Sequence, residues 1–106
     1  MENAQVFALL DSQEGTSLEF KKSLEFSESI ARTICAFANT LGGYIIVGVE
    51  KEGSKTTISG VLDVDAAFQK LPGIVSQIQP KPYYKATEHP MERSKMIIIK
   101  VDALPV

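Results

Sequence analysis

The sequence predicts a single α+β domain in which helices pack on a mixed β-sheet. Two short runs of apolar and β-branched residues, 44–49 and 95–101, are typical of strands. Two longer segments, 27–41 and 63–78, repeat apolar residues at helical spacing. With 106 residues, 44% of them hydrophobic and 23% charged, the chain has the size and composition for one core. We therefore expect one domain over residues 1–106, with its main elements in the order β-α-β-β-α-β-β.

The N-terminal segment predicts a short helix followed by a half-buried strand. Apolar residues gather in 3–10 and turn-forming residues fill 11–15, so a helix gives way to a loop there. From 16 to 22 apolar and polar residues alternate, with Leu18 and Phe20 on one face. The charged residues between them then lie on the opposite face of the strand.

The strongest helical pattern begins at Ser27, whose hydroxyl is a good N-cap. Apolar residues continue at helical spacing to Leu41, and the pair Gly42-Gly43 predicts the end of the helix. Cys35 lies within the apolar stripe, so we expect it to act as a small core residue.

A central strand and a hairpin are predicted next. Residues 44–49 predict a strand covered on both faces, followed by a turn at 50–54 and a returning strand at 55–59. Residues 48–56 also imitate a phosphate-binding loop. Ser54 stands where that motif requires lysine, however, and the residues that follow favour a strand over a helix. ATP is therefore not an expected ligand.

The C-terminal half predicts a further helix and a second hairpin. Helical spacing over 63–78 is broken at Pro72-Gly73, where we expect an interruption. Residues 83–87 predict a strand, 88–93 a turn region, and 95–101 a strongly apolar strand. The chain then ends in apolar residues, as is typical of the N-terminal part of a longer protein.

Composition argues against several classes of protein. No apolar run approaches the roughly 18 residues of a membrane-spanning helix and no secretory signal is present, so we expect a cytoplasmic protein. One cysteine and one histidine cannot form an intramolecular disulfide or a structural zinc site. The net charge of −2 conceals an asymmetry, because residues 1–53 carry four basic against eight acidic residues and residues 54–106 carry seven against five. This asymmetry is compatible with a basic face formed by the second half of a protein whose net charge is negative.

Three carboxylates are candidates for a divalent-metal site: Glu14, Glu19 and Glu50. Mg²⁺ and Mn²⁺ take oxygen ligands, and a metal-activated water can attack a phosphodiester. Residues five apart on a straight strand point to opposite faces, so Glu14 and Glu19 converge only if the chain turns at Gly15. The alternative interpretation is solvated surface charge.

A basic and aromatic segment near the C-terminus suits a nucleic-acid groove, because cations neutralise phosphates while aromatic rings stack on bases. The segment Lys81-Pro82-Tyr83-Tyr84-Lys85 is followed by His89, Arg93, Lys95 and Lys100. The residues expected to contact nucleic acid are Lys21, Lys81, Tyr83, Lys85, Arg93 and Lys95. Alternatively, one tyrosine packs in the core, the lysines protect a strand edge, and His89 is a loop residue.

Several segments together resemble one known family. They are Glu14 with Leu18-Glu19-Phe20-Lys21, Ala36-Phe37-Ala38-Asn39-Thr40-Leu41-Gly42-Gly43, Ile45-Ile46-Val47-Gly48-Val49, and Gly60. Over residues 12–106 the chain resembles the Schlafen-type AlbA-like domain, formerly called divergent AAA. That family is known mostly as the N-terminal, DNA-binding domain of bacterial transcriptional-regulator-like proteins. The resemblance implies an AlbA-like fold and binding of DNA or RNA without a cofactor.

The resemblance also offers a different function. In Schlafen ribonucleases two glutamates and an aspartate form a metal-dependent active site. The resemblance places Glu14 and Glu19 at the two glutamates and Glu50 at or beside the aspartate. A metal-dependent endoribonuclease that uses Mg²⁺ or Mn²⁺ is therefore the alternative. A second alternative is a homodimerising module in which strand edges at 44–49 or 96–101 pair between chains.

Overall fold

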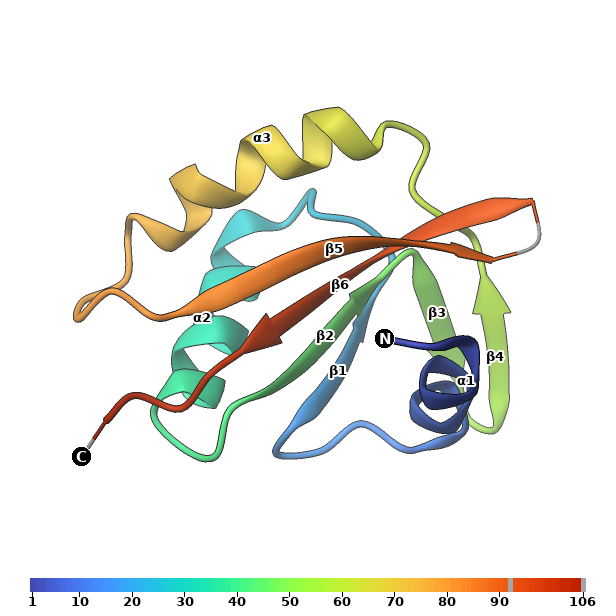
Figure 1. Ribbon diagram of the computed structural model, residues 1–106, viewed down its shortest axis with the longest axis horizontal. Coiled ribbons are helices and arrows are strands. Elements are labelled where there is room, and N and C mark those ends of the chain that lie inside the picture. The colour runs from blue at the N-terminus through green and yellow to red at the C-terminus, as the bar shows by residue number, and fades with distance from the viewer. Residues whose placement is uncertain (92, 106) are drawn as a thin grey trace.

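Four strands form a mixed sheet at the centre of the structure, in the order β1-β2-β6-β5 (Figure 1). The computed structural model describes residues 1–91 and 93–105. The elements are α1 (Asn3–Asp11), β1 (Leu18–Lys21), α2 (Ser27–Ala38), β2 (Gly43–Val47), β3 (Val49–Glu52), β4 (Lys55–Ile58), α3 (Val64–Val75), β5 (Tyr84–Met91) and β6 (Ser94–Val101). Strand β1 runs parallel to β2, whereas β6 is antiparallel to both of its neighbours. This mixed sheet with helices packed on it confirms the predicted α+β class.

Helices α2 and α3 cover one face of the sheet. Alternate residues of the two central strands, among them Ile45, Ile97 and Ile99, pack there with Ile34 of α2 and Leu71 of α3. None of these five side chains is more than 1% exposed. Burying an aliphatic side chain of this size contributes roughly 1.5–3 kcal/mol, so this face supplies much of the driving force for folding.

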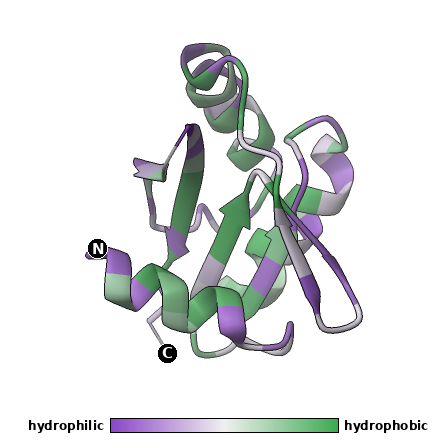
Figure 2. Ribbon diagram, turned by 90° about the vertical axis from the view of Figure 1, so that its right-hand side faces the viewer, coloured by the Kyte–Doolittle hydropathy of each residue, from purple (hydrophilic) through white to green (hydrophobic). Residues whose placement is uncertain are grey.

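Helix α1 and the hairpin β3–β4 cover the opposite face. Val6 of α1 packs there with Phe20, Ile46 and Ile98, which alternate along their strands with the residues of the first core. Figure 2 shows the apolar strands lying between α1 and α3. The sheet is therefore buried on both faces, as the apolar runs in its central strands predict.

Lys51 of β3 connects the β3–β4 hairpin to α1 through hydrogen bonds. Its Nζ donates to the backbone carbonyls of Leu10, at 2.8 Å, and of Ser12 at the C-terminal end of α1. The same ammonium group lies 5.0 Å from the centroid of the Phe20 ring. A cation at this end of a helix satisfies carbonyls that have no partner within the helix. Lys51 therefore helps to fix α1 on the sheet.

Gly48 divides the predicted strand at 44–49 into β2 and β3, which belong to different sheets. Its φ is +101°, and a Cβ at this position would lie 3.0 Å from the backbone of Gly60. Its carbonyl accepts the backbone N–H groups of Ser59 and Gly60, both at 2.9 Å. The returning strand β4 consequently pairs with β3 in a separate two-stranded sheet. The sequence predicts that 55–59 pairs with the strand at 44–49. In the structure β4 pairs only with β3, which contains the last residue of that predicted strand.

The two ends of α2 differ from the prediction. Ser27 is the first residue of the helix, and the cap position belongs to Phe26, which makes no side-chain capping hydrogen bond. Leu41 lies three residues beyond the helix and is 90% exposed, so its place on the apolar stripe was wrongly predicted. Gly42, with φ +79°, donates its N–H to the carbonyl of Phe37 at 2.8 Å. That bond closes the helix end, as the glycine pair predicts.

Two prolines lie inside elements where the sequence predicts breaks. Helix α3 begins at its N-cap Asp63 and continues through Pro72, so the predicted interruption is wrong. Strand β5 continues through Pro90 to Met91, so most of the predicted turn region at 88–93 is strand. Because β5 is an outer strand, proline can occupy it without removing a hydrogen bond from the middle of the sheet.

The outer strands of the four-stranded sheet are β1 and β5. Strands β2 and β6 each have a neighbour on both sides, so 44–47 and 96–101 are not the free edges that we expected for pairing between chains. Within the described part of the chain, no helix has the length and apolar character needed to cross a bilayer.

Candidate nucleic-acid interface

The side chain of Glu14 covers the outer edge of β1. Its Oε2 accepts the backbone N–H of Phe20 at 3.0 Å, and the N–H of Gly15 donates to the carbonyl of Leu18 at 3.0 Å. The chain thus turns at Gly15, which is the condition for Glu14 to approach Glu19. The turn brings the Glu14 carboxylate to a backbone amide, where it protects the strand edge from pairing with another chain.

Glu19 lies against α2. Its Oε2 accepts the hydroxyl of Thr33 at 2.5 Å and lies 3.3 Å from Nζ of Lys21. Lys21 also donates to the hydroxyl of Ser29 at 2.8 Å. These residues line a hollow of about 380 Å³ between β1 and α2. The carboxylate partly offsets the charge of Lys21, which the sequence assigned to nucleic-acid contact.

Glu50, the third predicted ligand, lies on β3 with Nζ of Lys22 4.0 Å from its Oε1. Each of the three predicted carboxylates therefore has a partner of its own. Across residues 1–91 and 93–105, no group of three or more His, Cys, Asp or Glu side chains is placed to hold a metal ion. In this arrangement the donors do not fit the divalent-metal site that the family resemblance implies.

The distal end of the β5–β6 hairpin carries Arg93 and Lys95. The Nζ of Lys95 lies 3.2 Å from the carboxylate of Glu88. Both basic residues line a hollow of about 540 Å³ that is also lined by Asp63 and Asp65 at the start of α3. Nearby carboxylates offset the positive charge, so this end of the hairpin is a poor surface for a polyanion.

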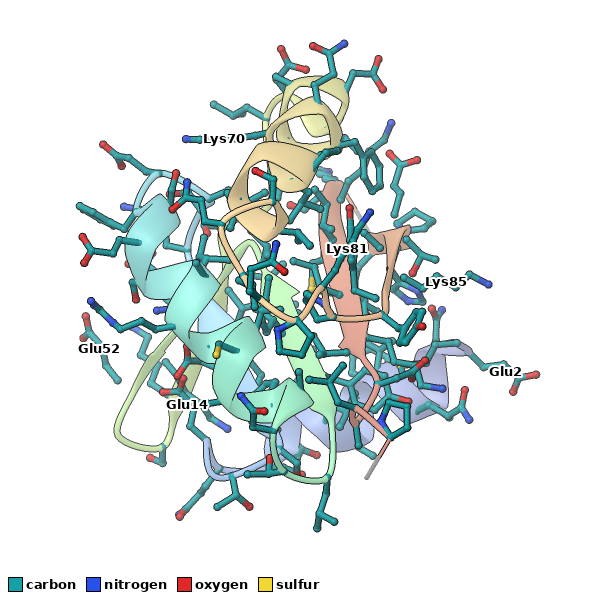
Figure 3. All side chains as sticks on the ribbon, turned by 90° about the vertical axis from the view of Figure 1, so that its left-hand side faces the viewer. Glu2, Glu14, Glu52, Lys70, Lys81 and Lys85 are labelled. Carbon is teal, nitrogen blue, oxygen red and sulfur yellow. The ribbon has the colours of Figure 1, made fainter. Side chains whose placement is uncertain are left out.

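The opposite end of β5 carries Lys81, Tyr83 and Lys85. All three are exposed, whereas Tyr84 packs against the core under α3, as expected for one of two adjacent tyrosines. Strand β5 has eight residues and is roughly 26 Å long, so Arg93 belongs to a separate group. Figure 3 shows Lys85 on one side of the molecule and Glu14 on the other, beside α2.

Two lysines and a tyrosine form a row across the sheet. Lys85 of β5 lies opposite Lys100 of β6, which in turn lies opposite Tyr44 of β2. The alternation that sends Ile98 toward α1 places all three on that face, and we call them the basic row. Neither lysine forms an ion pair with a carboxylate of the described residues. Like charges directly opposite each other on a sheet are unfavourable, and a bound polyanion would relieve the repulsion.

Sequence reasoning omitted Tyr44 and Lys100 from the predicted binding residues, because it assigned no register to the strands, and its turn region at 88–93 begins too early to give the right one. A turn over 88–93 would put Lys85 opposite Met96, an apolar core residue. In the structure the hairpin turns later and puts Lys85 opposite Lys100. Counting register outward from a correctly placed turn would have revealed the lysine pair.

His89 lies in β5 and not in the predicted loop. Its side chain is buried, and Nε2 lies 2.8 Å from Oδ1 of Asn3 in α1. It therefore helps to hold α1 on the sheet beside the basic row.

Cys35, which the sequence assigned to the core, is half-buried and packs against the core beneath α2. Its Sγ accepts a hydrogen bond from the side-chain amide of Asn39 at 3.4 Å.

Comparison with known proteins identifies a family and a fold. A family model described as Schlafen, AlbA_2 matches residues 14–105, which is nearly the whole chain. A search of the curated proteins finds no match. Helix α1 precedes the matched segment.

Two similar solved structures share the fold. One is the N-terminal domain of a protein of Nitrosomonas europaea that is described as related to the ATP-dependent DNA helicase RecG, with 22% identity, a TM-score of 0.71, and coverage of 91% of this chain and 71% of that one. The other is the DIP2311 protein of Corynebacterium diphtheriae, with 24% identity and a TM-score of 0.62 over 94% of this chain. The match spans 22% of the DIP2311 chain.

Proposed function

This chain belongs to the Schlafen AlbA_2 family, and from that premise we propose that it is a nucleic-acid-binding domain of a bacterial transcriptional-regulator-like protein. The basic row is the observation that carries the proposal. Two exposed lysines face each other there without a carboxylate partner among the described residues, and a tyrosine adjoins them. A phosphate backbone supplies the charge that the row lacks. The description of the Nitrosomonas protein as related to a DNA helicase is compatible with such a role.

Salt dependence tests the proposal. Labelled single-stranded DNA, single-stranded RNA and duplex DNA would be titrated with the purified chain between about 50 and 200 mM salt, with fluorescence anisotropy as the readout. We expect binding that weakens steeply with salt, and a logarithmic slope about two units smaller in the double variant Lys85→Gln/Lys100→Gln. Absence of binding to every probe at low salt would overturn the proposal.

A charge-matched control separates the basic row from net charge. Lys55 on β4 and Lys70 on α3 are exposed and lie outside the row. The double variant Lys55→Gln/Lys70→Gln removes the same charge, so it should retain nearly the wild-type slope. Equal losses in the two double variants would show that binding depends on net charge alone.

The metal-dependent ribonuclease is tested on the same samples. Each RNA reaction would be repeated with Mn²⁺ or Mg²⁺ and its fragments sized on a gel. We expect a mobility shift without fragments. Metal-dependent cleavage that disappears in Glu19→Gln would replace our proposal with the ribonuclease of the family resemblance. Light scattering on the protein alone would report whether the chain forms a homodimer.

A further inference from the structure

Two neighbouring hollows lie on the face of the sheet that carries the basic row. One hollow, of about 320 Å³, is lined by Lys85, Lys100 and Tyr44, together with residues near the start of α1. A second hollow, of about 450 Å³, is lined by Tyr44 and Lys100 and by residues toward the end of α1. The two hollows share Tyr44 and Lys100, so they lie next to each other along the basic row, and we call the pair of them the groove.

Helix α1 and the residues beside it form one wall of this groove. The N-terminal residues on this wall are Met1, Gln5, Leu9 and Ser12. Gln5 and Leu9 are four residues apart and share one face of α1, while Met1 and Ser12 lie just beyond its two ends. None of them carries a charged side chain, whereas the acidic Glu2 and Asp11 line neither hollow. The N-terminal side of the two hollows therefore carries no charged side chain, and Lys85 and Lys100 supply positive charge beneath them. Asp102, directly after β6, lines the second hollow only, so the first hollow is the more favourable place for a phosphate.

We infer that this groove binds a single strand of nucleic acid, with the phosphates on Lys85 and Lys100 and an unpaired base against Tyr44. The inference rests on the proposed function and adds to it the form of the ligand and the participation of α1. That helix precedes residues 14–105, so the matched family segment alone does not supply the wall.

The geometry favours one strand over a duplex. Tyr44 is partly buried, packs on the core below it, and lines both hollows, so only a group that enters the groove reaches its ring. Bases in a duplex are stacked and paired, whereas an unpaired base can leave its strand and stack on an aromatic side chain. The hollows have the size of small-ligand pockets, which a base fills and a duplex does not enter.

A pair of variants on α1 tests the wall. Gln5→Glu adds a negative charge inside the groove and preserves the capping interaction, in which the Gln5 side chain accepts the N–H of Glu2 at 2.8 Å. Ala4→Glu adds the same charge one residue away, at an exposed position that lines neither hollow. We expect Gln5→Glu to weaken binding of a 12-nucleotide oligothymidylate about fivefold more than Ala4→Glu does.

A second pair of variants tests the basic row. Tyr44→Leu removes the aromatic ring and should weaken single-strand binding by about 5- to 100-fold, while Tyr44→Phe should retain most of the affinity. The wild-type chain should bind oligothymidylate or oligouridylate more tightly than duplex DNA of the same length. Circular dichroism would confirm that each variant is folded. If Tyr44→Leu does not fold, the comparison of Gln5→Glu with Ala4→Glu tests the groove on its own.

The outcomes separate this inference from the proposed function. Binding of no probe by the wild-type chain overturns both. Binding that is unaffected by Tyr44→Leu, or equally affected by Gln5→Glu and Ala4→Glu, overturns the groove and leaves nucleic-acid binding in place. Tighter binding of duplex than of either single strand likewise overturns the single-strand inference. Preference for oligothymidylate or for oligouridylate would identify DNA or RNA as the source of the strand, and either supports the inference.

Discussion

Lys85 and Lys100 lie directly opposite each other on neighbouring antiparallel strands, and the register of β5 and β6 keeps them there. Both are exposed, and neither has a carboxylate partner among the described residues. A like-charged cross-strand pair opposes folding, so an anion that binds between the two lysines lowers its free-energy cost. This relationship links the stability of the sheet to the proposed function.

Replacing one lysine of this pair should separate stability from binding. Lys85→Glu creates an opposite-charge pair with Lys100 and is expected to raise the free energy of unfolding by about 0.5 kcal/mol. The same change should weaken nucleic-acid binding, because it places a carboxylate beside the phosphates. Urea denaturation and anisotropy would measure the two effects. A less stable variant with unchanged affinity would contradict our account of the pair.

Glu14 is expected to stabilise the outer edge of β1. Glu14→Ala removes the acceptor of the Phe20 N–H and should lower the free energy of unfolding by about 1 kcal/mol. Glu14→Gln keeps an oxygen acceptor at the same position and should cost less. Denaturation curves of the two variants provide the comparison, and equal losses would show that the negative charge, and not the hydrogen bond, is what stabilises the edge.

Lys51 is expected to hold α1 in place. Lys51→Met keeps an apolar stem but leaves the Leu10 and Ser12 carbonyls without their ammonium donor, so stability should fall by about 1 kcal/mol. The loss should appear as faster amide hydrogen exchange in α1. Lys55→Met on the exposed strand β4 is the matched control. Unchanged exchange in α1 would mean that Val6 and its neighbours alone fix the helix.

Gly48 is expected to tolerate no side chain. Gly48→Ala forces a residue with a Cβ to adopt φ +101° and brings that Cβ to 3.0 Å from the Gly60 backbone, so we expect a loss of about 2–3 kcal/mol. Gly53→Ala is the control, since Gly53 also has positive φ but open space around it. Its loss should be about 1 kcal/mol. Thermal melting compares the two, and equal losses would argue that close approach to Gly60 has no part in the effect.

The class of fold could be predicted because its signals are local. The alternation of Leu18 and Phe20 with charged residues predicts β1, and the apolar run before Gly48 predicts a strand covered on both faces. Proline signals were less reliable, since Pro72 lies inside α3 and Pro90 inside β5. Both residues are read as breaks by local propensity, but packing of α3 on the sheet and the outer position of β5 accommodate them.

The candidate site was less predictable, because it depends on contacts between distant segments. Lys81, Tyr83 and Lys85 were chosen as neighbours in sequence, but Lys85 acquires its partners Lys100 and Tyr44 only through strand pairing. Arg93 and Lys95 belong to the same sequence segment and lie near carboxylates at the far end of the hairpin. Adjacency along the sequence therefore grouped residues that the structure separates, and it did not group Lys85 with Tyr44.

The sequence by itself determined the family, the α+β class and most of the elements, because motifs and hydrophobic periodicity are written in consecutive residues. Only the tertiary structure decided which charges meet. It directed the Glu14 carboxylate to a backbone amide, paired Lys21 with Glu19, and left Lys85 facing Lys100 beside the groove along α1. The physical reason is that the sign of a local charge is a property of one side chain, whereas an electrostatic site is a property of the register that brings several of them together.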